Sequence, residues 1–214
     1  MKHKFYLFLT IITLFNACDC NNKSSQKEEK PPLQTEIEED REIVIKKIPP
    51  KTASPKEYSF KFEDLQKNAS LIKMEKNIYN FTNIKQPIVM ISLFATWCPP
   101  CRGQIPHLSN LQKKFKEHLF ILGALVHDDI KNKRLEKFII AEKVLFFISI
   151  NQKDNLKFAH MITPKLRLDK EFPLPLMILF FKGKYFTHYE GSMPEEMIES
   201  DIEQLIEQLN KMKD

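Results

Sequence analysis

The sequence IVMISLFATWCPPC, residues 88–101, decides the fold of this chain. Its first half, Ile88 to Phe94, is apolar at almost every position and rich in β-formers, which is typical of a strand buried on both faces of a sheet. Ala95 and Thr96 then turn the chain. From Cys101 onward the apolar residues recur every three or four positions, which predicts a helix. The two cysteines therefore lie where a buried strand gives way to a helix N-terminus.

This position predicts a reactive thiol at Cys98. The unpaired N–H groups and the positive end of the helix dipole stabilise an anion there, which lowers the pKa of the Cys98 thiol. The thiolate is the attacking species, and Cys101, one turn deeper and shielded, resolves the mixed disulfide that Cys98 forms. Pro99 and Pro100 fix φ between the two cysteines and restrict how the loop relaxes when the disulfide opens. The pair is a predicted catalytic dithiol.

Two other interpretations of a single Cys-x-x-Cys motif are half of a zinc site and a purely structural disulfide. A structural zinc site needs four ligands, and the sequence holds no second Cys-x-x-Cys and no closely spaced Cys/His pair to supply them. A bridge that closes so short a loop adds little stability. The motif and its strand-to-helix setting therefore favour redox chemistry, with no metal and no other cofactor.

Two stretches, residues 92–106 and 174–184, carry a resemblance to a known family. The chain resembles the TlpA/ResA-like group of exported thiol-disulfide oxidoreductases, the first stretch matching the family's strand, active site and kinked helix. The second stretch resembles the segment with the family's cis-proline and a following strand, turn and strand. The resemblance implies an α/β thioredoxin fold, with a central mixed sheet flanked by helices on both faces.

The resemblance also implies a substrate-binding edge beside the cysteines. If Pro175 is the family's proline, its preceding bond is cis, and Leu174 presents its backbone next to Trp97 and the dithiol for an extended substrate. X-Pro bonds alone tolerate cis cheaply, and proline leaves no competing N–H donor. Pro173 is the rival candidate, and an ordinary trans turn is the alternative. We favour Pro175, because the apolar strand begins directly after it.

The chain departs from its relatives at two supporting positions. Where many cytoplasmic thioredoxins have a buried acidic residue six positions before the first cysteine, this chain has Ser92. Where many family members have Glu three positions after the second cysteine, it has Gln104. Both changes remove a carboxylate that could accept the proton of Cys101, so the sequence leaves the activation of that thiol open.

The N-terminus predicts export and a membrane anchor. Lys2 and Lys4 precede an apolar core that ends in Asn16-Ala17-Cys18. We interpret residues 1–17 as a signal peptide cleaved before Cys18, whose thiol then carries lipid, as in bacterial lipoproteins. An uncleaved signal anchor is the alternative. Either route tethers the domain in the periplasm or extracytoplasmic space, an oxidising compartment, and leaves Cys20 as a bystander thiol.

The remaining chain divides into a linker and one domain. Residues 18–57 are polar and contain too few apolar side chains to fold alone, so they read as a lipid-anchored, disordered linker with an edge strand at 43–45 as a minor alternative. Residues 58–214 form the thioredoxin-like domain, in which strands and helices alternate. After the strand at 88–94 we expect strands at 119–126, 144–150, 176–181 and 185–189, and helices at 131–142, 154–161 and from 195 on, the last with Met197, Ile198, Ile202, Leu205, Ile206 and Leu209 on its core face.

The net charge and the family resemblance indicate which partners to expect. The formal net charge of +5 falls to +3 when Lys2 and Lys4 leave with the signal, which is too little to favour nucleic acid. We expect a membrane-anchored oxidoreductase that reduces disulfides of exported proteins, such as apocytochrome c in cytochrome c-type biogenesis. Its partners are then exported protein thiols and a membrane electron-donor protein. The alternatives are a DsbA-like disulfide donor and a redox-independent binding protein or chaperone.

Overall fold

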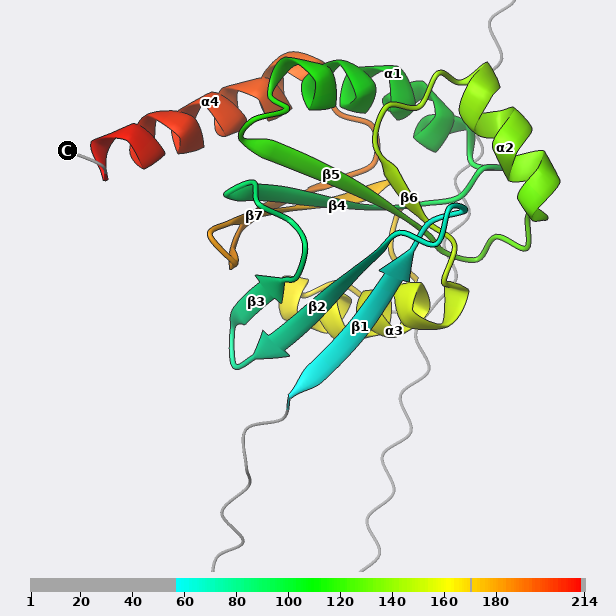
Figure 1. Ribbon diagram of the computed structural model, residues 1–214, viewed down its shortest axis with the longest axis horizontal. Coiled ribbons are helices and arrows are strands. Elements are labelled where there is room, and N and C mark those ends of the chain that lie inside the picture. Colours follow the sequence, from blue (N-terminus) through cyan, green and yellow to red (C-terminus); the bar gives the residue numbers. More distant parts are fainter. Residues whose placement is uncertain (1–56, 170, 213–214) are drawn as a thin grey trace, which may run out of the picture. The chain divides into compact units, whose positions relative to one another are not determined.

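The computed structural model describes residues 57–169 and 171–212 (Figure 1). One sheet holds all its strands in the order β1-β2-β3-β8-β7-β4-β5-β6. No helix within these residues is long and apolar enough to cross a membrane. The elements are β1 (Tyr58–Glu63), β2 (Ala69–Glu75), β3 (Ile78–Phe81), β4 (Ile88–Phe94), α1 (Pro99–Lys114), β5 (Leu119–Leu125), α2 (Asn132–Ala141), β6 (Phe147–Ser149), α3 (Gln152–Ile162), the 3₁₀ turn η1 (Thr163–Leu166), β7 (Leu176–Phe181), β8 (Lys184–Glu190) and α4 (Glu195–Lys211).

Strand β4 lies inside the sheet, between β7 and β5, and has the bounds that the sequence predicts. All its residues are buried. It pairs in parallel with β5 and antiparallel with β7, so the sheet is mixed. A strand with neighbours on both edges and helices on both faces has no solvent-facing side, and this explains why its sequence is apolar without alternation.

Helices cover both faces of the sheet (Figure 1). On one face Ile88 and Met90 of β4 pack in a cluster with residues of α1 and α4. On the other face Val89 and Ile91 pack with residues of α3, whose Phe158 is fully buried. The predicted α/β class and the thioredoxin fold are confirmed.

The predicted elements after residue 88 are present, with two differences. The strand expected at 144–150 is shorter, Phe147–Ser149, because the backbone N–H of Val144 still bonds back to Ile139 at the end of α2. Met197 does not share the buried face of α4, and 53% of it is exposed. It lies one position, about 100° of helix rotation, before the buried row that starts at Ile198.

The strands β1, β2 and β3 come before the strands that are predicted from the sequence. The outer edge of β1 is hydrogen-bonded to other elements. The backbone N–H of Lys61 donates to the carboxylate of Asp154 at 2.7 Å, and its carbonyl accepts from the Asn151 side chain at 2.8 Å. The carbonyl of Glu63 accepts from the N–H of Ile150 at 2.8 Å. An open edge strand offers its backbone groups to other chains. Here groups at the start of α3 and the end of β6 occupy them.

Gly183 in the β7–β8 turn is expected to tolerate no side chain. Its φ is +74°, and a Cβ at this position would lie 2.5 Å from the backbone oxygen of Tyr79. Replacing Gly183 by alanine therefore adds a backbone collision to the cost of a left-handed conformation, and we expect the free energy of unfolding to fall by more than about 2 kcal/mol. Urea denaturation followed by circular dichroism measures this.

Gly191 supplies the matched control. Its φ is +75°, but no atom lies within 4 Å of a Cβ built there. Gly191→Ala is expected to cost only the conformational part, about 1 kcal/mol. Equal losses for the two alanine variants would contradict the role of the Tyr79 carbonyl.

Candidate functional site

Cys98 is the N-cap residue of α1, one position before the helix begins. Its Sγ accepts a hydrogen bond from the backbone N–H of Cys101 at 3.3 Å. Pro99 and Pro100 occupy the first two helical positions, where a missing N–H costs nothing. The helix therefore starts at Pro99 rather than at Cys101, and the prediction that the first cysteine lies at a helix N-terminus is confirmed.

The two cysteines form a disulfide. Cys98 is 4% exposed and Cys101 is 2% exposed, and both pack in an apolar cluster with Phe94 of β4 and Leu135 of α2. Trp97, the residue before them, is instead 62% exposed. The sulfur atoms thus sit at the floor of a shallow site whose rim carries the chain's single tryptophan.

Leu174 and Pro175 lie against the first cysteine. The Leu174–Pro175 peptide bond is cis, as the family resemblance implies, so Pro173 is not the cis-proline. The carbonyl oxygen of Leu174 lies 3.7 Å from Cys98 Sγ. Segments 76 positions apart in sequence therefore meet at the predicted reactive sulfur.

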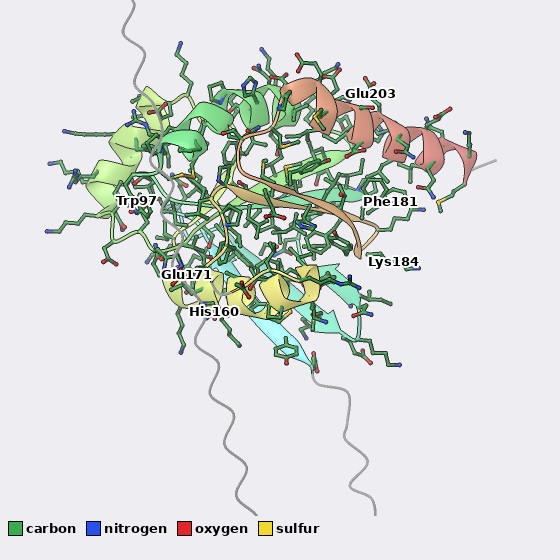
Figure 2. The ribbon with its side chains drawn as sticks, turned by 180° about the vertical axis from the view of Figure 1, so that it is seen from behind. Trp97, His160, Glu171, Phe181, Lys184 and Glu203 are labelled. Atoms are coloured by element: carbon green, nitrogen blue, oxygen red, sulfur yellow. A yellow bond between two sulfur atoms is a disulfide. The ribbon has the colours of Figure 1, made fainter. Side chains whose placement is uncertain are left out.

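A pocket of about 490 Å³ opens beside Cys98. Its wall combines aromatic and proline rings with one carboxylate, and Figure 2 shows Trp97 and Glu171 on the same side of the molecule. A pocket of this volume and apolar character has room for a large side chain. It is lined by Trp97, Cys98, Pro99, Pro100, His127, Glu171, Phe172 and Leu174.

The loop after β5 holds the turn that precedes the cysteines. Asp128, which is 5% exposed, accepts hydrogen bonds from the backbone N–H groups of Thr96 at 2.5 Å and Ile130 at 3.1 Å. The indole N–H of Trp97 donates to the backbone carbonyl of His127 at 2.9 Å. Side chain and backbone of residues 127–128 therefore set the position of the Thr96–Trp97 turn.

Replacing Asp128 by asparagine is expected to lower the free energy of unfolding by about 1–3 kcal/mol. The asparagine side chain keeps one acceptor, so its NH₂ group faces either the Thr96 or the Ile130 N–H, and one partly buried donor loses its charged partner. Chemical denaturation of the oxidised protein measures the loss. Asp129→Asn is the matched control, because Asp129 is exposed, and a similar loss in both variants would show that only net charge matters.

The two supporting positions, Ser92 and Gln104, are both 1% exposed. Ser92 lies in β4 opposite Met177 of β7. The Gln104 Oε1 accepts from the backbone N–H of Met193 at 2.8 Å, whereas its buried Nε2 has no partner among the described residues. Gln104 thus connects α1 to the loop before α4.

Two basic residues of α1 after the cysteines, Arg102 and His107, have partners away from the sulfur atoms, and one predicted site residue lies outside the described residues. Arg102 forms an ion pair with Glu142 at the end of α2, and His107 contacts Glu195 at 3.0 Å. The predicted lipidation site, Cys18, lies outside the described residues.

Sequence reasoning missed the contributions of His127, Asp128, Glu171 and Phe172 to this site. Asp128 had a usable signal, since polar residues that follow a buried parallel strand gather at the carboxyl edge of the sheet, where ligands of open α/β sheets bind. Glu171 and Phe172 directly precede the Pro173-Leu174-Pro175 segment, and this proximity pointed to the same site.

A family model described as the AhpC/TSA family matches residues 61–175, which is more than half of the chain. Over 116 residues the chain is 28% identical to the thiol-disulfide oxidoreductase ResA of Halalkalibacterium halodurans, covering 54% of this chain and 60% of that protein. The ResA protein of Geobacillus thermodenitrificans is 26% identical over 137 residues, covering 63% of this chain and 72% of that one. The match thus spans less than two thirds of the first relative.

A solved structure agrees with the fold. The thiol:disulfide interchange protein of the thioredoxin family from Chlorobium tepidum superposes with a TM-score of 0.54 at 15% identity, covering 72% of this chain and 97% of that structure. At this identity the likeness concerns the fold alone.

Proposed function

Because the chain belongs to the AhpC/TSA family and the matched region contains both cysteines and Pro175, we propose that it is a thiol-disulfide oxidoreductase that reduces disulfides of exported proteins. One observation carries the proposal. The Cys98–Cys101 disulfide lies at the N-terminus of α1, with the Leu174 carbonyl 3.7 Å from Cys98 Sγ and a pocket beside it.

The reaction begins with the reduced form of the site. The Cys98 thiolate, stabilised by the Cys101 N–H and by the helix N-terminus, attacks one sulfur of a substrate disulfide. A bond forms between Cys98 Sγ and that sulfur while the substrate S–S bond breaks, and the second substrate sulfur leaves as a thiolate and takes a proton. Backbone groups of Leu174 align the extended substrate during this step.

The second step releases the substrate. Cys101 loses its proton and attacks Cys98 Sγ, which re-forms the intramolecular disulfide and frees the first substrate sulfur. Two electrons pass from the dithiol to the substrate. Since Ser92 and Gln104 carry no carboxylate, we propose that water reaching the site through the pocket takes the Cys101 proton.

The proposal includes a location and partners. A cleaved signal over residues 1–17 and lipid on Cys18 would hold the domain at a bacterial membrane, in the periplasm or extracytoplasmic space. A membrane electron-donor protein would then reduce the Cys98–Cys101 disulfide again, and apocytochrome c is a candidate substrate. Two relatives that carry the name thiol-disulfide oxidoreductase ResA support the thiol chemistry of these proposed partners.

Insulin reduction tests the activity. We expect the protein to accelerate the precipitation of insulin in the presence of dithiothreitol, and to exchange its disulfide with glutathione. If it did neither, the enzymatic proposal would fail. A Cys98→Ser, Cys101→Ser double variant that restored growth of a deletion strain would favour a binding protein or chaperone instead.

Equilibrium with a glutathione buffer tests the direction of electron flow. A reduction potential far below about −200 mV supports a reductant, whereas one near about −120 mV supports a DsbA-like disulfide donor. A Cys101→Ala variant should accumulate mixed disulfides with its substrate, because the resolving thiol is absent. Identifying the captured proteins would name the substrate.

A further inference from the structure

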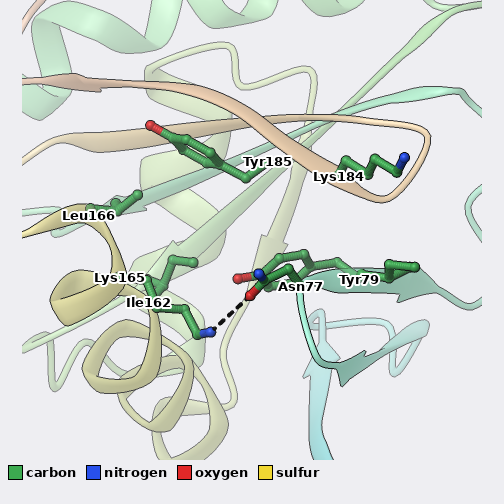
Figure 3. Close-up of a pocket in the computed structure, with 8 residues that line it drawn as sticks. Asn77, Tyr79, Ile162, Lys165, Leu166, Lys184 and Tyr185 are labelled. Carbon is green, nitrogen blue, oxygen red and sulfur yellow. Dashed lines mark hydrogen bonds between the residues drawn. The ribbon is translucent and has the colours of Figure 1, made fainter.

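The end of the sheet away from the cysteines carries a second pocket, of about 540 Å³, between the β2–β3 and β7–β8 turns and η1 (Figure 3). Its wall is apolar, with Ile78 from β3, Tyr185 from β8, and Ile162 and Leu166 from the α3–η1 segment. Lys165 and Lys184 line it as well. We call this surface, together with Lys182 of the β7–β8 turn, the basic end.

The apolar side chains of the basic end are open to solvent. Ile78 is 47% exposed and Tyr185 is 43% exposed. A β-bulge next to Phe180 shifts the register of β8, so that Tyr185 rather than Phe186 stands opposite Phe180. This register brings Tyr185 to the wall of the pocket.

The segments that form the basic end contain more lysines than acids. Residues 75–78 and 181–185 contain three lysines, Lys76, Lys182 and Lys184, against one acid, Glu75. Within the described residues Lys165, Lys182 and Lys184 form no ion pair, and the Lys165 ammonium reaches only the Asn77 side-chain oxygen, at 3.4 Å (Figure 3). Ammonium groups beside exposed aliphatic and phenolic side chains match a surface that is both anionic and apolar.

The basic end lies opposite the redox site and close to the start of the domain. Strand β7 runs from Leu176, next to Pro175, to Phe181 in the basic end, a span of roughly 17 Å at the usual rise of a strand. Figure 2 shows Trp97 and Lys184 on opposite sides of the molecule. Tyr58 pairs with Met74, which pairs with Tyr79 of the pocket, so the chain enters the domain at this same end.

We propose that the basic end docks on the surface of an anionic phospholipid bilayer. The lysine ammonium groups bind lipid phosphates, and the Tyr185 ring lies at headgroup depth, where amphipathic rings are favoured, with the aliphatic Ile78 side chain beside it. The Cys98–Cys101 site then faces away from the membrane, toward exported polypeptides. The described chain begins at this same end, at residues 57–58, and with the lipid anchor of the proposed function, on which this step rests, a membrane is favoured over an acidic protein as the occupant.

Tryptophan quenching by brominated lipids tests this orientation, since the chain has a single tryptophan, Trp97. The full chain is reconstituted on vesicles of brominated phosphatidylglycerol and phosphatidylcholine. We expect strong quenching in a Tyr185→Trp, Trp97→Phe variant, and at most one fifth of it for native Trp97. Ile140→Trp in the Trp97→Phe background is the matched control, because Ile140 is 76% exposed on α2, outside the basic end.

Lysine substitutions test the electrostatic part. At about fivefold per lysine, Lys182→Gln with Lys184→Gln lowers the ratio of docked to undocked protein about 25-fold, and quenching of Y185W falls accordingly. Lys133→Gln with Lys137→Gln on α2 removes the same charge and leaves the quenching unchanged. Circular dichroism checks the fold of each variant, and Phe186→Trp provides a second probe if Y185W does not fold.

Three outcomes would overturn the proposal. The first is quenching of native Trp97 as strong as that of Y185W. The second is quenching of Y185W that is equal on charged and uncharged vesicles. The third is quenching of Y185W that does not change when Lys182 and Lys184 are replaced by glutamine. A blue shift of Y185W with an acidic protein but not with vesicles would assign the surface to a protein partner. Insulin reduction, measured without vesicles, separates these results from failure of the proposed function.

Discussion

Replacing Cys98 by alanine is expected to lower the rate of insulin reduction by more than about 10³-fold, because the covalent step loses its nucleophile. Cys101 cannot substitute for it. Cys101 is 2% exposed and lies one helical turn deeper, whereas Cys98 Sγ adjoins both the Leu174 carbonyl and the pocket. The rate of insulin precipitation per mole of protein measures the effect.

Controls separate this loss from unfolding and from other thiols. Cys20→Ala is expected to keep the full rate, since Cys20 precedes the domain and has no assigned role. The circular dichroism spectrum of Cys98→Ala should match that of the reduced protein. A variant that still reduced insulin at a tenth of the normal rate would show that Cys101 can attack directly, and the assigned order of the two thiols would be wrong.

Replacing Phe158 by alanine is expected to lower the free energy of unfolding by about 3–5 kcal/mol, the range for removing a buried aromatic side chain. Phe158 is fully buried in α3. Its ring packs edge-on against Phe60 and Phe62 of β1, with centroids 5.4 Å and 5.6 Å away. The substitution would leave a cavity between α3 and β1. Urea denaturation measures the decrease in the free energy of unfolding.

Phe186 provides the comparison for this prediction. Its side chain is 37% exposed, so Phe186→Ala removes the same group from a surface position and is expected to cost under about 1 kcal/mol. If both alanine variants lost the same stability, the packing of α3 on β1 would contribute nothing specific. A loss of cooperativity in Phe158→Ala alone would instead indicate that β1 detaches before the rest of the sheet.

The sequence predicted the central strand and the site best where several signals coincided. Residues 88–94 form an apolar run that is followed by a turn, a cysteine and two prolines. Each of these signals indicates the same boundary, between the end of β4 and the start of α1. The cysteines and Pro175 could be paired only through the family resemblance. Nothing in local spacing brings Leu174 to Cys98.

The N-terminal strands were missed because their pattern is weak. In β1 the buried residues Phe60 and Phe62 alternate with Ser59 and Lys61, and β2 has the same period with Ser70 among its buried positions. Such a period-two pattern is typical of a half-buried strand. It was overlooked next to a long polar segment. Asp128 was missed for a different reason. A single acidic residue after a strand indicates a site only when the fold shows which loop lies next to it.

The bonded edge of β1 has a consequence for how this protein would meet the unfolded polypeptides that the proposed function implies. A domain that handles extended chains risks being joined by them as an extra strand, which would sequester its client away from the thiols. The backbone groups of Lys61 and Glu63 are already hydrogen-bonded to residues at the start of α3 and the end of β6. An added strand therefore could not pair with them. Under the proposed function, an extended client would pair with the Leu174 carbonyl beside Cys98 instead, where alignment leads to disulfide exchange rather than to aggregation.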